Sequence, residues 1–167
     1  MPNPWAGSKF YAKLGNTFTR PLWSVLPAPS GFGILTTIGR RSGKPRRHSV
    51  RAIRQGDIVF VVAMMGEKAS WLKNIRADPE VTLRLGKETF NGTAQEANDS
   101  PVRQRAMDAY TGTVTLGDYF DYIAYHWGFP TRSKIVRAHR HWFEDGVPLI
   151  IQLEPSKEAT KQPNTRA

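Results

Sequence analysis

The chain has 167 residues, 40% of them hydrophobic and 23% charged, and this length suits a single domain with a buried core. The absence of cysteine excludes disulfide scaffolds, thiol nucleophiles and cysteine-based zinc sites. No apolar run reaches the roughly 20 residues that a membrane helix needs. The first residues also lack the basic and apolar segments of a secretory signal, so we expect a cytoplasmic protein.

The positive charge is concentrated in the first third of the sequence. Lys and Arg total 24 against 14 Asp and Glu, which gives a net charge of +10. Ten cations precede the first acidic residue, Asp57, and seven of them lie between Thr36 and Arg54. A cluster this dense raises the local potential and attracts anions. The candidate anions are phosphates, nucleic acid or a membrane surface, and a solvated basic face is the plainer alternative.

The N-terminal segment, residues 5–26, is rich in Trp, Phe and Leu. Phe10, Leu14 and Phe18 recur at helical spacing, which predicts an amphipathic helix over residues 8–18. Such a helix either docks on the core or lies on a membrane surface, so peripheral membrane contact through this segment stays open.

The rest of the chain alternates short β-type runs with four helical patterns. The predicted strands are residues 32–38, 47–54, 58–64, 81–85, 89–96 and 148–153, and the predicted helices are residues 70–77, 101–110, 118–127 and 131–142. Ser70 is expected to cap the first helix. The Asn91-Gly92 pair is read as a bulge inside a strand.

This order favours an α+β fold, a barrel of about six mostly antiparallel strands with packed helices, over a doubly wound sheet. We divide the chain into a helical, Pro-rich lead-in over residues 1–30, a barrel domain over residues 31–154 and a disordered tail over residues 155–167. The barrel domain carries a helical insertion at about residues 99–142.

A basic turn follows the first predicted strand, with the sequence GRRSGKPRR from Gly39 to Arg47. Two glycines and a serine allow backbone N–H groups to turn inward beside guanidinium groups, which is a geometry that holds a phosphate. The turn is not a P-loop, because the glycine spacing is one residue short and Pro45 stands where Ser or Thr binds magnesium. The glycines at positions 31 and 33 also fail as a dinucleotide fingerprint.

Little else in the sequence carries chemistry. His126, His139 and His141 lack carboxylates at ligand spacing, so no metal site is expected and they are read as core or surface residues. Tyr119, Tyr122 and Tyr125 recur every three residues and supply flat apolar faces, either for core packing or as a wall for a planar substrate. A phosphate cradle without acid–base groups is typical of an enzyme whose cofactor performs the reaction.

Three stretches resemble the deazaflavin (coenzyme F420)-dependent nitroreductase and quinone reductase family, which is related to the flavin-binding split β-barrel proteins. They are ILTTIGRRSGKPR at residues 34–46, WLKNI with ADPEV at residues 71–81, and Leu153-Glu154-Pro155. The resemblance covers about residues 32–96 and the last strand. It implies a split β-barrel and hydride transfer from reduced coenzyme F420 to a planar, electron-poor acceptor such as a quinone, nitro compound or conjugated enone.

The resemblance also implies roles for particular residues. Arg41, Ser42, Gly43 and Arg46 would hold the coenzyme phosphate, with Arg40 and Lys44 nearby. The remaining cofactor-binding candidates are His48, Val50, Met64, Gly66, Lys68, Trp71 and Asn74. Arg51 stands where characterised nitroreductases place a tyrosine near the ring, so it joins the three tyrosines as a candidate for the acceptor wall.

Two other functions remain as alternatives: a flavin mononucleotide (FMN) enzyme of the same barrel class, and a basic nucleic-acid-binding barrel. Nucleic acid is not expected as a partner, because aromatic residues are not interleaved with the cations of the cluster. The chain is expected to be a monomer or a dimer.

Overall fold

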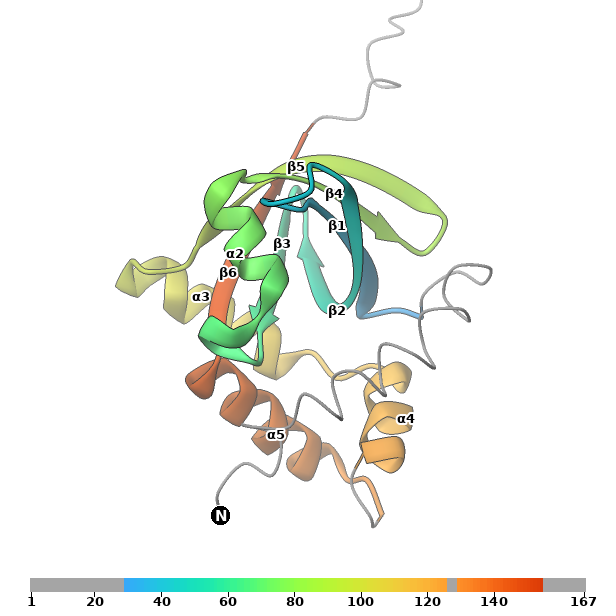
Figure 1. Cartoon of the computed structure of the whole chain (residues 1–167). Coiled ribbons are helices and arrows are strands. Elements are labelled where there is room, and N and C mark those ends of the chain that lie inside the picture. The colour runs from blue at the N-terminus through green and yellow to red at the C-terminus, as the bar shows by residue number, and fades with distance from the viewer. Residues whose placement is uncertain (1–28, 126–128, 155–167) are drawn as a thin grey trace, which may run out of the picture.

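The structure is a computed structural model that describes residues 29–125 and 129–154. In these residues six antiparallel strands form a closed barrel in the order β1-β2-β3-β6-β5-β4 (Figure 1). The strands are β1 (Phe32–Ile38), β2 (Pro45–Gln55), β3 (Ile58–Ala63), β4 (Glu80–Leu85), β5 (Glu88–Glu96) and β6 (Val147–Leu153). The α+β barrel expected from the sequence is confirmed.

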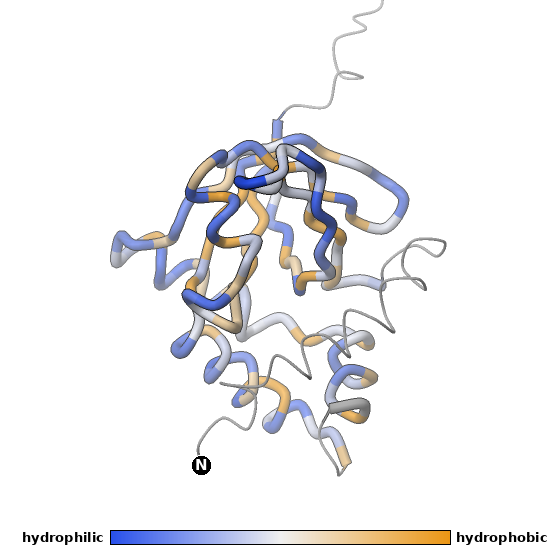
Figure 2. Tube along the Cα trace, in the orientation of Figure 1, coloured by the Kyte–Doolittle hydropathy of each residue, from blue (hydrophilic) through white to orange (hydrophobic). Residues whose placement is uncertain are grey.

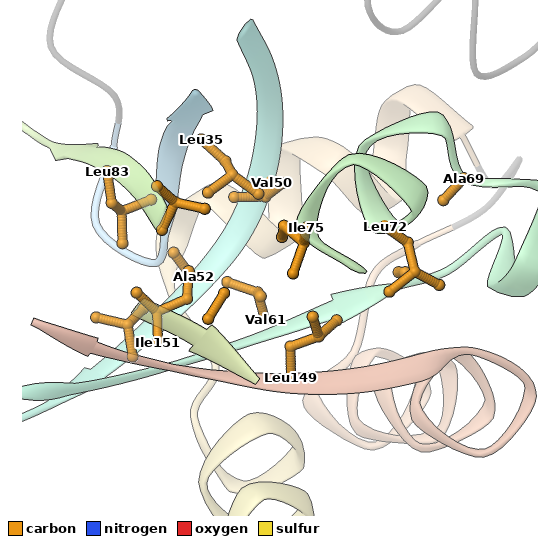
Figure 3. Close-up of a cluster of buried hydrophobic side chains, with 14 of the residues drawn as sticks. Leu35, Val50, Ala52, Val61, Ala69, Leu72, Ile75, Leu83, Leu149 and Ile151 are labelled. Atoms are coloured by element: carbon orange, nitrogen blue, oxygen red, sulfur yellow. The ribbon is translucent and has the colours of Figure 1, made fainter. Parts of the chain in front are cut away.

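The barrel interior is apolar because alternate residues of each strand point inward. Leu35, Val61 and Leu83 are among the fully buried side chains of this core. One end is closed by the helix α2 (Ser70–Ala77), which inserts Leu72 and Ile75 between the strands (Figure 3). A 3-10 turn, η1 (Gly66–Lys68), leads from β3 into this helix.

A second core lies between the outer face of the barrel and the remaining helices. These are α3 (Ser100–Gly112), α4 (Leu116–Tyr125) and α5 (Arg132–Asp145). Phe60 and Ile53 from the strands pack with Tyr110 of α3 and Phe143 of α5. Figure 1 shows α4 and α5 at the end of the barrel away from the connection between β1 and β2. The two ends of β2 therefore face different surroundings.

Most predicted elements are confirmed with shifted ends, but two details are wrong. No bulge is present at Asn91-Gly92, where the pairing of β4 with β5 is continuous. Gly92 is instead needed because a Cβ there would lie 2.5 Å from the carbonyl oxygen of Gln152 on β6. Ser70 does not cap α2: the N-cap is Ala69, and no side chain caps the helix.

Some predictions fall outside the described residues. They concern the helix over residues 8–18, the end of the helix predicted to reach residue 127, and the tail over residues 155–167. Within the described residues, no helix is long and apolar enough to cross a bilayer.

Candidate functional site

The basic turn connects β1 to β2, and its backbone forms a compact loop. The Gly39 N–H donates to the Lys44 carbonyl at 2.9 Å, and the Ser42 and Gly43 N–H groups both donate to the Gly39 carbonyl. Gly43 has a φ of 62°, a left-handed conformation that suits glycine. The Lys44 N–H donates to the Ser42 hydroxyl. Most backbone donors of the loop are therefore used inside it.

This use of backbone donors differs from the phosphate cradle expected from the sequence, in which the N–H groups turn toward the anion. The donors that face solvent are side chains. Arg40, Arg41, Lys44, Arg46 and Arg47 are all exposed. Figure 2 shows the connection between β1 and β2 as a hydrophilic segment at the rim of the barrel. An anion at this rim would be bound by guanidinium, ammonium and hydroxyl groups.

The charge of this loop is uncompensated within the described residues. Each ion pair found there joins residues outside 40–47, as in Arg54 with Glu88 and Arg76 with Glu67 and Glu96. The Arg46 guanidinium instead donates to the Ser42 hydroxyl at 3.4 Å. The loop therefore presents a positive potential that an anionic ligand would neutralise.

Helix α2 lies against the loop, and Asn74 joins the two. Its side-chain oxygen accepts from the Arg40 backbone N–H at 3.3 Å and from the Arg40 guanidinium at 3.1 Å. Its side-chain amide donates to the Thr37 hydroxyl at 3.1 Å, and Asn74 is buried. Thr37 was missed by sequence reasoning, although it occupies an inward position near the end of its strand. Asn74 thus fixes the loop to the helix that closes the barrel.

Strand β2 has an open edge beside this loop. Its residues 45–51 pair with β1, whereas its pairing with β3 covers only Ala52 to Gln55. Among the described strands, residues 45–51 therefore have a neighbour on one side only. Because directly paired residues share a face, Arg46, His48 and Val50 lie on the same side as Thr37, Leu35 and Gly33 respectively. A planar polar ligand could approach the backbone of β2 along this edge.

The remaining cofactor-binding candidates lie between β3 and α2. Met64 is exposed, Gly66 and Lys68 belong to η1, and Trp71 is half-buried against the barrel core. The structure thus joins the loop to α2 through Arg40 and Asn74 at one end of the barrel. Gly66 lies farther along, where a Cβ would be 3.6 Å from the carbonyl oxygen of Asp145 at the end of α5.

The predicted acceptor residues lie at the other end. Tyr119 and Tyr122 are half-buried on α4, and Tyr125 ends the helix. A hollow of about 480 Å³ opens at this end and is lined by residues that include Phe32, Leu85, Thr113 and Thr115. Along β2, Arg46 is separated from Arg51 by five residues, roughly 17 Å of extended chain.

Arg51 does not lie in an exposed wall. Alternation along β2 turns its side chain away from the barrel interior, where it is 3% exposed and forms an ion pair with Asp118 at 2.8 Å. Sequence reasoning missed Asp118 as its partner. The available signal was a pair of acidic residues, Asp118 and Asp121, inside a largely aromatic and apolar helix.

Residues 10–124, more than half of the chain, match the protein family described as F420H(2)-dependent quinone reductase. The chain belongs to this family. The family expected from the sequence motifs is therefore confirmed.

Individual relatives are more distant. The chain is 32% identical over 65 residues to the F420H(2)-dependent quinone reductase of Mycobacterium tuberculosis (strain ATCC 25618 / H37Rv). That match covers 37% of this chain and 44% of the relative, so it spans less than half of the curated protein's length.

Solved structures share the fold of this chain. An F420-H2 dependent reductase aligns with a TM-score of 0.51 and 20% identity, over 77% of this chain and 97% of that chain. A domain-swapped dimer aligns with the same TM-score and 19% identity, over 84% of this chain and 96% of the other.

Proposed function

We propose that this chain is a deazaflavin-dependent oxidoreductase that reduces a planar, electron-poor acceptor, with quinones as the first class to test. The observation that carries the proposal is the uncompensated, exposed cluster of cations in the loop between β1 and β2, beside the open edge of β2, in a member of this family.

The loop residues would bind the anionic part of the coenzyme. Arg41 and Arg46 supply guanidinium donors, and Ser42 supplies a hydroxyl that already lies 3.4 Å from Arg46. Arg40 is held by Asn74 and so keeps its charge at a fixed place beside them. Lys44 and Arg47 extend the positive surface, which suits the poly-glutamyl tail of the coenzyme. The chemistry of these donors fits a phosphate, although the backbone N–H groups contribute little.

The open edge of β2 would bind the polar rim of the ring system. The ring would lie along His48 and Val50, with Met64 and Trp71 beside it. The bound reduced coenzyme supplies a hydride, so the protein needs no nucleophile and acts by orienting two flat molecules. We place the acceptor at the α4 end of the barrel. Tyr119 and Tyr122 lie on α4, and Thr113 and Thr115 of the segment that leads into α4 line the hollow.

The proposal includes two finer points about partners. Residues 5–26 would contact a membrane surface, and the chain would be a monomer or a dimer. Co-sedimentation of the whole chain with anionic lipid vesicles, together with light scattering in solution, tests both points. A chain that stays in the supernatant would contradict the membrane contact, and a larger assembly would contradict the second point.

The test of function is a titration of the pure protein with coenzyme F420, in which the fluorescence of the coenzyme reports binding. We expect saturable binding at micromolar concentration, and loss of reduced-coenzyme absorbance when a quinone is added. No binding at these concentrations would refute the proposal. A yellow protein with a bound flavin spectrum would favour the FMN alternative. Tight, salt-sensitive binding of oligonucleotides without coenzyme binding would favour a nucleic-acid-binding barrel.

A further inference from the structure

A buried polar cluster joins strand β2 to the three helices outside the barrel. All three nitrogens of the Arg51 guanidinium are engaged: Nε donates to Asp118 at 2.8 Å, Nη1 to the Tyr110 carbonyl at 2.8 Å and Nη2 to the Thr113 carbonyl at 2.5 Å. The Arg51 guanidinium also lies over the Tyr110 ring, 4.4 Å from its centroid. One side chain therefore fixes the end of α3 and the segment that leads to α4.

Asp118 is held from four directions. Oδ1 accepts from Arg51 and lies 3.2 Å from His139 Nε2, and Oδ2 accepts from the Thr115 N–H at 2.7 Å and from its hydroxyl at 2.9 Å. Burial alone would raise the pKa of Asp118, but hydrogen bonds from His139 and Arg51 hold it well below its usual range. Burial lowers the pKa of His139, and its hydrogen bond to Asp118 partly opposes this shift.

This cluster determines how α4 faces the barrel. Asp118 lies in the first turn of α4, and Tyr122 follows it by four residues on the same face of the helix. The opposite face carries the exposed side chains of Leu116, Phe120 and Ile123. Because Asp118 is bound to β2 through Arg51, the face that carries Tyr122 is turned toward the barrel. The cluster also holds Thr113 and Thr115, which line the hollow.

We propose that Asp118 and Arg51 are positioning residues for the acceptor: their ion pair sets the rotation of α4 and the course of residues 113–115, and so sets the place where a planar acceptor binds. This inference rests on the proposed function. It gives Arg51 a part in acceptor binding without contact to the acceptor, in place of the wall position suggested by the sequence.

A purely structural role makes a different prediction. A buried ion pair can often be replaced by apolar side chains of similar volume with little loss of stability, whereas removal of one partner leaves a buried charge. The double variant Arg51→Met/Asp118→Leu therefore keeps a packed interface and removes the directional contacts. A structural role would leave its catalysis intact, and a positioning role would not.

The experiment compares this double variant with the wild type and with Arg140→Met. Arg140 follows the buried His139 on α5, but its own side chain is exposed and it does not line the hollow. We expect the double variant to bind coenzyme F420 with an unchanged Kd, while its KM for the quinone rises by about tenfold or more. Amide hydrogen exchange in α4 should become about tenfold faster. Arg140→Met should match the wild type in all three measurements.

An unchanged KM together with unchanged exchange in α4 would overturn the inference. A second variant covers the case in which the double variant does not fold. Thr115→Val removes one hydroxyl bond to Asp118 and keeps the ion pair, and we expect a rise of about threefold in the quinone KM with an unchanged coenzyme Kd. An unchanged KM in that variant would also contradict the inference. If the wild type binds no coenzyme, the proposed function fails, and the exchange measurement still tests whether the ion pair fixes α4.

Discussion

Arg46 and Arg51 lie on the same strand, five positions apart, and their surroundings are opposite. Arg46 is exposed beside a loop of cations that has no carboxylate partner among the described residues, and its guanidinium contacts a serine hydroxyl. Arg51 is buried, and its guanidinium is bound by a carboxylate and two carbonyl groups. A charge left uncompensated at the surface is available to a ligand, whereas a compensated, buried charge fixes neighbouring elements.

The largest expected effect is on stability at the buried arginine. Arg51→Met leaves the Asp118 carboxylate buried without its main partner, and we expect a loss of about 3–5 kcal/mol in the free energy of unfolding. Urea denaturation followed by circular dichroism measures this loss. The double variant Arg51→Met/Asp118→Leu should recover most of it. A single variant that loses less than about 1 kcal/mol would show that the pair is not the anchor of this region.

The exposed arginines should behave in the opposite way. Arg46→Ala and Arg41→Ala should each weaken coenzyme binding by about 1.5–3 kcal/mol, the range for hydrogen bonds to charged groups. Their free energies of unfolding should stay within about 0.5 kcal/mol of the wild type, because both side chains are on the surface. A fluorescence titration and a urea curve on each variant measure both quantities. Unchanged affinity in both variants would reject the phosphate site.

Asp121 connects the comparison to pH. The pKa of Asp121 is raised from the usual 3.8 to about 7, mainly because the side chain is buried. The negative charge of Asp118 raises this pKa further, and the positive charge of Arg51 partly lowers it. An acid whose pKa is raised on folding favours the folded state at low pH, so this contribution is complete below about pH 4 and is lost as the pH rises to about 7. We therefore expect Asp121→Asn to be more stable than the wild type at pH 8, by about 1–3 kcal/mol.

At pH 4 the stability difference between Asp121→Asn and the wild type should disappear. His139 acts in the other direction, because its pKa is lowered and its contribution is lost as the pH falls below its unfolded value. The difference between variant and wild type isolates Asp121, since both proteins contain His139. Equal unfolding free energies at pH 8 would contradict the assignment.

The smallest expected effect is at Arg54. Its ion pair with Glu88 is solvent-exposed and long, and its guanidinium lies 4.4 Å from the centroid of the Phe90 ring. Arg54→Met should change the free energy of unfolding by about 1 kcal/mol or less. A loss as large as that of Arg51→Met would show that burial does not explain the contrast along β2.

The sequence predicts the barrel well because its information is local. The β-type runs over residues 32–38, 47–54 and 58–64 specify strands without reference to distant residues, and the short connection between the last two fits a hairpin. The basic turn is equally local, and the structure keeps its cations together at one rim. His139 was read as a core or surface residue, and it is buried.

The partners of Arg51 could not be predicted in this way. Asp118 lies 67 positions away, and only the packing of α4 against the barrel brings the two together. An arginine is buried only where it finds such a partner. The residue type of Arg51 and its place in a strand therefore did not predict that its side chain would be buried. The sequence also did not predict that the Ser42 and Gly43 N–H groups donate to the Gly39 carbonyl, because these hydrogen bonds depend on the conformation of the turn.

A crystal structure of the chain with coenzyme F420 tests the central claim most directly. We predict that the coenzyme phosphate lies within hydrogen-bond distance of Arg41 or Arg46, with the ring along the open edge of β2 and its far end toward α4. A phosphate bound elsewhere, with both guanidinium groups in solvent, would contradict the account.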